Sequence, residues 1–163
     1  MTPLQIVLLI LLVPITLFNF LFLTSGRKKN KEGRMQYQRI MSELSEKAVR
    51  ELGQSKTMVV FPYLSDSDVG CLLCIDRKKD LEAIVTDAVV LKMKISSPKS
   101  CEILSETDGG KILGSLSCRV DYPETGESLE IPFGSKPHRI NGYIGRFLVR
   151  NAEEFKKRIL EAE

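Results

Sequence analysis

The chain has 163 residues and a formal net charge of +3. Residues 27–34 hold five basic side chains and one acid, so the rest of the chain carries a net charge of −1. A charge confined to one segment excludes the overall basic character typical of nucleic-acid-binding proteins, and we expect no nucleic-acid partner.

Residues 4–23 (LQIVLLILLVPITLFNFLFL) contain no charged side chain. A helix rising about 1.5 Å per residue needs about 20 residues to cross a hydrocarbon core about 30 Å thick. This run is longer than the apolar core of a signal peptide, no basic residue precedes it, and it ends in a poor cleavage site. We therefore predict an uncleaved transmembrane anchor over 1–26, with a signal peptide or a buried helix as the alternatives.

A basic cluster follows the apolar run at once. It consists of Arg27, Lys28, Lys29, Lys31 and Arg34. Because basic flanks stay on the cytoplasmic side, we expect a single-pass plasma-membrane protein whose C-terminal part is cytoplasmic. The cluster is interpreted as this topology signal, and it is also compatible with a contact to anionic lipid in the bilayer.

Apolar residues recur at helical spacing beyond the cluster and predict a helix over roughly 33–52, ended by Gly53. With the basic flank, this helix forms a predicted linker over 27–54. Its apolar face has three possible partners: its own domain, a second copy in a short coiled coil, or the membrane surface.

From residue 55 the apolar pattern changes to the period of two that is typical of strands. We expect seven short strands, over about 58–63, 71–76, 81–86, 89–95, 101–104, 112–122 and 129–133. Tight turns join most of them, which favours an antiparallel sheet. Residues 134–150 are predicted to be an irregular connection with a hairpin turn at Asn141-Gly142, followed by a helix with Asn151 as its N-cap.

This order of elements resembles the pleckstrin-homology (PH) superfold over about 57–163, and the chain is similar to small membrane-anchored bacterial proteins with PH-like domains. The resemblance implies an α+β, mainly-β domain over 55–163. Its fold would be a seven-stranded antiparallel barrel plugged at one end by Phe155 and Ile159 of the C-terminal helix. Phosphoinositide-binding members carry a basic pattern in the first hairpin. Here that loop, residues 64–70, has two acids and no base, so we do not expect inositol-phosphate recognition at that place.

The chain contains the cysteines Cys71, Cys74, Cys101 and Cys118, which should be reduced thiols in a cytosolic domain. The first two have CxxC spacing, but the leucines between them belong to a predicted strand, and the chain's one histidine is distant in sequence. We therefore expect neither a metal nor another cofactor. No nucleophile stands beside a base, so we expect a non-enzymatic protein, with a thiol nucleophile in the CxxC pair as the alternative.

Residues 135–150 are the most basic part of the predicted domain. The candidate contact residues there are Lys136, Arg139, Tyr143, Arg146 and Arg150. They are interpreted either as a solvated loop or as a contact with an acidic partner or anionic headgroups. The sequence thus favours an accessory or scaffold protein that binds a membrane protein, a cytosolic protein or a second copy of itself. A peripheral anionic-lipid-binding module is the alternative.

Overall fold

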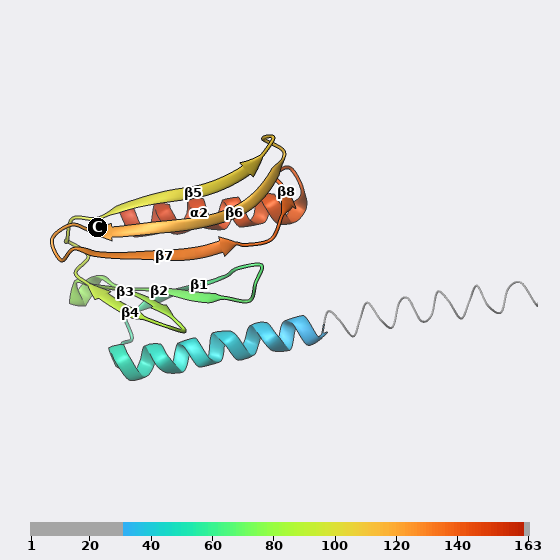
Figure 1. Ribbon diagram of the computed structural model, residues 1–163. Helices are drawn as coiled ribbons and strands as arrows, with labels where there is room; N and C mark the ends of the chain where they lie inside the picture. Colours follow the sequence, from blue (N-terminus) through green and yellow to red (C-terminus); the bar gives the residue numbers. More distant parts are fainter. Residues whose placement is uncertain (1–30, 162–163) are drawn as a thin grey trace, which may run out of the picture. The chain divides into compact units, whose positions relative to one another are not determined.

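The computed structural model describes residues 31–161 (Figure 1). The predicted anchor over 1–26 and the part of the basic cluster before Lys31 lie outside the described residues. Within 31–161, no helix is both long and apolar enough to cross a bilayer. Residues from Ile40 onward form one compact unit, whereas residues 31–39 belong to another and are helical and exposed.

Helical structure covers residues 31–52, close to the predicted 33–52. The helix ends at Gly53, whose φ of 75° is the left-handed conformation of a helix C-terminus, and the Gly53 amide donates to the Val49 carbonyl at 2.9 Å. Within the compact unit, Leu44 and Ala48 are buried in a small cluster with side chains of the following strands. Of the three possible partners of the helix, the apolar face of this part therefore packs against its own domain.

In the described part of the chain, the strands form two antiparallel sheets. The first contains β1 (Val59–Leu64), β2 (Gly70–Asp76), β3 (Leu81–Thr86) and β4 (Val90–Met93) in that order. The second contains β5 (Ser100–Asp108), β6 (Ile112–Tyr122) and β7 (Glu127–Gly134), and a short β8 (His138–Arg139) pairs with the start of β6. The seven predicted strands are confirmed, and β8 was not predicted.

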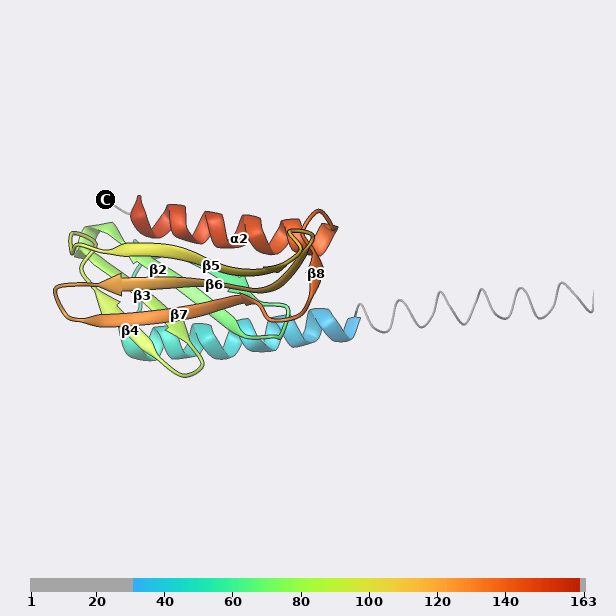
Figure 2. The same ribbon diagram turned by 45° about the horizontal axis from the view of Figure 1, so that its top comes forward.

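The main core lies between the two sheets, and the helix α2 (Tyr143–Leu160) runs along the second sheet (Figures 1 and 2). Every residue of β2 is buried, because one face of this strand meets the core and the other meets the helix segment 40–52. This two-sided burial explains why the segment GCLLCI is an unbroken run of small and apolar residues.

The buried stripe of α2 joins the core, and Phe155 and Ile159 are fully enclosed there. The ring of Phe155 lies 5.3 Å from that of Tyr63 and 5.6 Å from that of Phe133, in edge-to-face and tilted geometries. Aromatic pairs in such geometries contribute about 0.5–1.5 kcal/mol beyond the area they bury. The result is a mostly antiparallel β domain with a C-terminal helix packed into its core.

The prediction of an irregular connection over 134–150 was wrong from residue 143 on. α2 begins at Tyr143 with Gly142 as its N-cap, so Asn141-Gly142 is no hairpin turn and Asn151 lies inside the helix. The early turns were missed because several of their apolar side chains are exposed and interrupt the apolar stripe. Gly145 also disfavours a helix in the sequence. The structure requires a glycine there, because a Cβ at this position would lie 2.3 Å from the Arg139 carbonyl oxygen.

The four cysteines are buried free thiols, as expected. Cys71 contacts the inter-sheet core and Cys74 contacts the opposite cluster beside the helix, so the CxxC pair points to two faces of β2. Burial raises the pKa of the Cys71 thiol and raises that of Cys74 to about 11, which works against a thiolate nucleophile. Within 31–161, no group of three or more potential ligands is placed to hold a metal ion.

Candidate interaction surface

Three of the five candidate contact residues in 135–150 gather on the exposed face of the first half of α2. Tyr143, Arg146 and Arg150 line one shallow hollow of about 310 Å³ together with Phe147. Their spacing of three, four and seven residues places them on one side of the helix. We call these four side chains the aromatic–arginine patch.

Large apolar surface is exposed in this patch and beside it. Tyr143 is 82% exposed and Phe147 is 42% exposed, and the neighbouring Ile144 also reaches solvent. The Arg150 guanidinium carbon lies 5.9 Å from the centroid of the Phe147 ring, within the range of a cation–π contact. Tyr and Arg are the side chains most enriched among the residues that dominate binding energy at protein interfaces.

The charge of the patch is not neutralised by its neighbours. α2 has no acid in its first turn, and in the described chain neither Arg146 nor Arg150 forms an ion pair. At the other end of the same helix, by contrast, Lys157 and Arg158 are paired with acids. Because the N-terminal end of a helix also carries a partial positive charge, the patch is a positively charged surface.

The other two predicted contact residues lie outside the patch. Lys136 is bound to Asp66, since its ammonium donates to the Asp66 carbonyl at 2.8 Å and its amide donates to the carboxylate at 2.9 Å. Arg139 lies in β8 opposite Ile112. Phe147 was not in the predicted set, although its spacing of four residues from Tyr143 would have indicated it once the helix was known to begin earlier.

The carboxylate of Asp66 is the centre of a clamp between the β1–β2 loop and the segment after β7. It accepts hydrogen bonds from the Ser135 amide at 2.8 Å and the Lys136 amide, and His138 Nε2 lies 2.9 Å from it. Burial alone would raise the pKa of Asp66, but these hydrogen bonds outweigh it and the pKa is lowered. The acidic loop is therefore a structural clamp, with its carboxylate already occupied.

Comparisons with known proteins gave no match to a family model, to a curated protein or to a solved structure.

Proposed function

We propose that the chain is a non-enzymatic, single-pass accessory or scaffold protein of the plasma membrane. Residues 1–26 anchor it, and its cytoplasmic domain binds an acidic protein partner through the aromatic–arginine patch. The observation that carries this proposal is the exposure of Tyr143 and Phe147 between arginines that have no ion-pair partner in the described chain.

The arrangement of elements supports the finer proposal that the domain is PH-like. One four-stranded antiparallel sheet precedes another, formed by β5, β6, β7 and the short β8, and a C-terminal helix packs its apolar stripe into the core between them.

The protein-binding role is tested by affinity capture of the full chain from gently solubilised membranes. The variant Arg146→Glu inverts one charge of the patch, and Tyr143→Ala removes its most exposed ring. A specific partner should be captured with the unaltered chain and should be reduced at least about tenfold with either variant, as expected for truncation of a binding hot spot.

The matched control is Lys157→Glu, which makes the same charge inversion on an exposed position of the same helix outside the patch. This control should leave capture unchanged. Recovery of the bare chain alone, or equal capture by the patch variants and the control, would overturn the proposal.

An anionic leaflet is the second candidate partner, because apolar and aromatic side chains beside arginines are also typical of helices that bind membrane surfaces. The chain has no tryptophan, so Phe147→Trp creates a single fluorophore in the patch. Leu160→Trp, at a similarly exposed position near the end of α2, is the control. With the full chain in vesicles, quenching of the Phe147→Trp signal by brominated lipid that requires anionic lipid would favour the leaflet over a protein.

A further inference from the structure

The outer side of strand β1 is an open sheet edge. In residues 31–161, β1 pairs only with β2, so the other side of the strand has no strand neighbour. Val59 is 52% exposed and Val60 43% exposed, which is unusual for two successive valines of a central apolar run. Such an edge presents backbone donors and acceptors to which another extended chain can pair.

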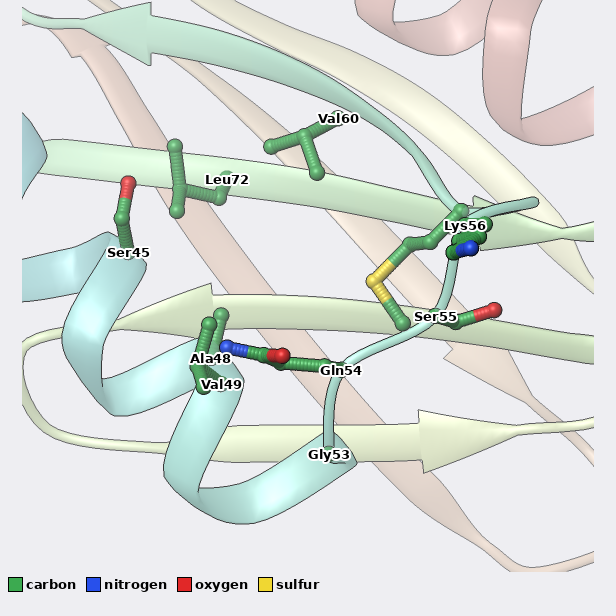
Figure 3. A pocket seen from close by; sticks show the side chains of 10 residues that line it. Ser45, Ala48, Val49, Gly53, Gln54, Ser55, Lys56, Val60 and Leu72 are labelled. Atoms are coloured by element: carbon green, nitrogen blue, oxygen red, sulfur yellow. The ribbon is translucent and has the colours of Figure 1, made fainter.

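A pocket of about 510 Å³ lies on the helix side of this edge. Met58, Val60 and Leu72 form its sheet wall, and Ala48 and Val49 form its helix wall. Figure 3 shows the side chains of Val60 and Leu72 projecting from adjacent strands toward the end of the helix, with Gln54 and Ser55 on the connecting segment. The pocket is thus largely apolar and is bounded on one side by the free strand.

A second pocket, of about 460 Å³, lies on the opposite face of the same strand. Its apolar lining comes from Val59, Phe61 and Ile75, and Arg77 and Lys78 stand at its border. The two pockets therefore flank one strand edge, and successive β1 side chains alternate between them.

This arrangement matches the side-chain alternation of an added strand. In an extended chain paired with β1, side chains would point alternately to the two faces of the sheet, about 3.3 Å apart along the chain. Neighbouring residues of such a chain would enter the helix-side pocket and the opposite pocket in turn, while its backbone paired with β1. Pro62 lacks an amide hydrogen and limits this ladder to the first half of the strand.

The charges around the edge indicate what kind of chain would pair there. Lys56 lines the helix-side pocket and Arg77 and Lys78 line the other, and neither pocket is lined by an acid. The nearby carboxylate of Asp76 accepts hydrogen bonds from Ser55 at 2.5 Å and from Thr57 at 2.7 Å, so it is engaged in holding the segment before β1. The border of the site is therefore positive.

We infer that the β1 edge binds, by strand addition, an extended segment of a partner protein with successive apolar side chains flanked by acids. Backbone pairing to β1 supplies the alignment, the two pockets accept apolar side chains, and the basic border attracts the acidic flanks. This site is separate from the aromatic–arginine patch and does not depend on the function proposed for it.

The test uses the full chain in detergent and a fluorescein-labelled peptide of sequence Asp-Glu-Val-Ile-Val-Ile-Val-Glu-Asp, whose apolar side chains point to both faces, and binding is measured by fluorescence anisotropy. A second peptide has proline at the central valine, which removes one backbone donor, and a third has lysines in place of its four acids. We expect the first peptide to bind with a dissociation constant below about 1 mM and each of the others to bind at least about tenfold more weakly.

Val60→Asp places a charge in the helix-side pocket, and Val89→Asp changes an equally exposed valine in the β3–β4 turn. The first variant should lose peptide binding at least about tenfold, and the second should keep it. Circular dichroism of both variants reports whether the fold is retained. Hydrogen exchange should show protection of β1 amides when the first peptide is added to the unaltered chain.

Three outcomes would overturn the inference: no binding of the first peptide, equal binding of the proline peptide, or equal binding by Val60→Asp. A fourth concerns a second copy of this chain. If light scattering shows a dimer for the unaltered chain and a monomer for Val60→Asp, the edge serves self-association, and the assignment to a partner segment is wrong.

Discussion

The two ends of the inter-sheet core differ in how their buried polar groups are satisfied: at one end these groups are paired, and at the other a buried hydroxyl has no partner in the described residues. They lie at the two ends of β2, because Tyr63 is opposite Cys71 at the start of this strand and Glu82 is opposite Ile75 near its end. One end encloses a network of charged side chains. The other end is a cluster of aromatic rings, and the nearby carboxylate of Asp66 lies outside the apolar core. The difference shows that one small core can be bounded at one end by a buried ion pair and at the other by packed aromatic rings.

The charged end consists of Glu82, Lys99 and Tyr122, which we call the Glu82 network. The Glu82 side chain is fully buried and that of Lys99 almost so, with the ammonium 2.8 Å from the carboxylate. The Tyr122 hydroxyl donates to the other carboxylate oxygen at 2.7 Å, and Lys99 also donates to the Ile95 carbonyl. Because Glu82 is in β3 and Tyr122 is in β6, the network links the two sheets.

The aromatic end consists of Tyr63, Phe133 and Phe155. The Tyr63 ring makes edge-to-face contacts with both phenylalanines, at 5.7 Å and 5.3 Å between centroids. Its buried hydroxyl has no hydrogen-bond partner in the described residues. Burial raises the pKa of this hydroxyl, so it stays neutral. Asp66, three residues further on, forms its clamp beside this cluster, and its side chain is only 7% exposed.

The largest effect should come from breaking the Glu82 network with Glu82→Gln. The variant keeps the size of the side chain but leaves the Lys99 ammonium buried without its counter-charge, so the free energy of unfolding should fall by about 3–5 kcal/mol. Urea denaturation of the full chain in detergent measures this change. The control Glu51→Gln removes an exposed pair with Lys92 and should cost less than about 1 kcal/mol.

A second variant sharpens the interpretation of this result. Adding Lys99→Met to Glu82→Gln removes the stranded charge, so the double variant should recover most of the lost stability. A loss below about 1 kcal/mol for Glu82→Gln alone would show that the Lys99 ammonium escapes to solvent and that the network is not a closed one.

At the other end of the core, Asp66→Asn should lower the free energy of unfolding by about 2 kcal/mol at pH 7, because charge-assisted hydrogen bonds to two backbone amides are weakened. The pKa of Asp66 is lowered in the folded state, so its contribution is present above the unfolded pKa near 4 and is lost as pH falls through the folded value. The difference between the two proteins should therefore shrink on acidification.

Urea titrations at pH 7 and at about pH 3 measure this difference. Asp108→Asn, at the exposed end of β5, is the control for general carboxylate effects. A difference that stays constant down to the lower pH would contradict the view that the ionised form of Asp66 holds the clamp.

The sequence predicted most of the fold because its signals are local. Alternation along β6 is visible in the sequence and puts Leu116, Cys118, Val120 and Tyr122 on one face, and all four are buried. In contrast, the partners of Glu82 are 17 and 40 residues away, and no local pattern connects an acid in a strand with them. The start of α2 escaped prediction for a different reason: its exposed apolar side chains interrupt the apolar stripe, and Gly145 is typical of a helix end although it packs against the Arg139 carbonyl oxygen.

The candidate site was predictable only in part. The charge of residues 135–150 indicated a basic surface, and Tyr143, Arg146 and Arg150 do lie together. Lys136 could not be separated from them by sequence, because its role depends on Asp66, 70 residues earlier in the chain. The open edge of β1 was equally hidden: strand order, which no short pattern specifies, decides which strand is left without a neighbour.

A smaller effect is expected at the hydroxyl of the Glu82 network. Tyr122→Phe removes one hydrogen bond to a buried carboxylate and leaves Lys99 in place, so the free energy of unfolding should fall by about 1–2 kcal/mol. Urea denaturation of the full chain measures it. A neutral result would mean that Lys99 alone satisfies Glu82 and that Tyr122 only fills space there.

The same substitution at the aromatic end should have the opposite sign. Tyr63→Phe removes a buried hydroxyl that has no partner in the described residues, while it keeps the ring and its contacts with Phe133 and Phe155. Since an unsatisfied buried hydroxyl costs about 1–3 kcal/mol, its removal should leave stability unchanged or raise it by up to about 1 kcal/mol. Thermal and urea unfolding of this variant beside Tyr122→Phe measure the contrast directly. If Tyr63→Phe is destabilising to the same degree, the hydroxyl of Tyr63 has a partner in the folded protein, and the two ends of the core are closed in the same way.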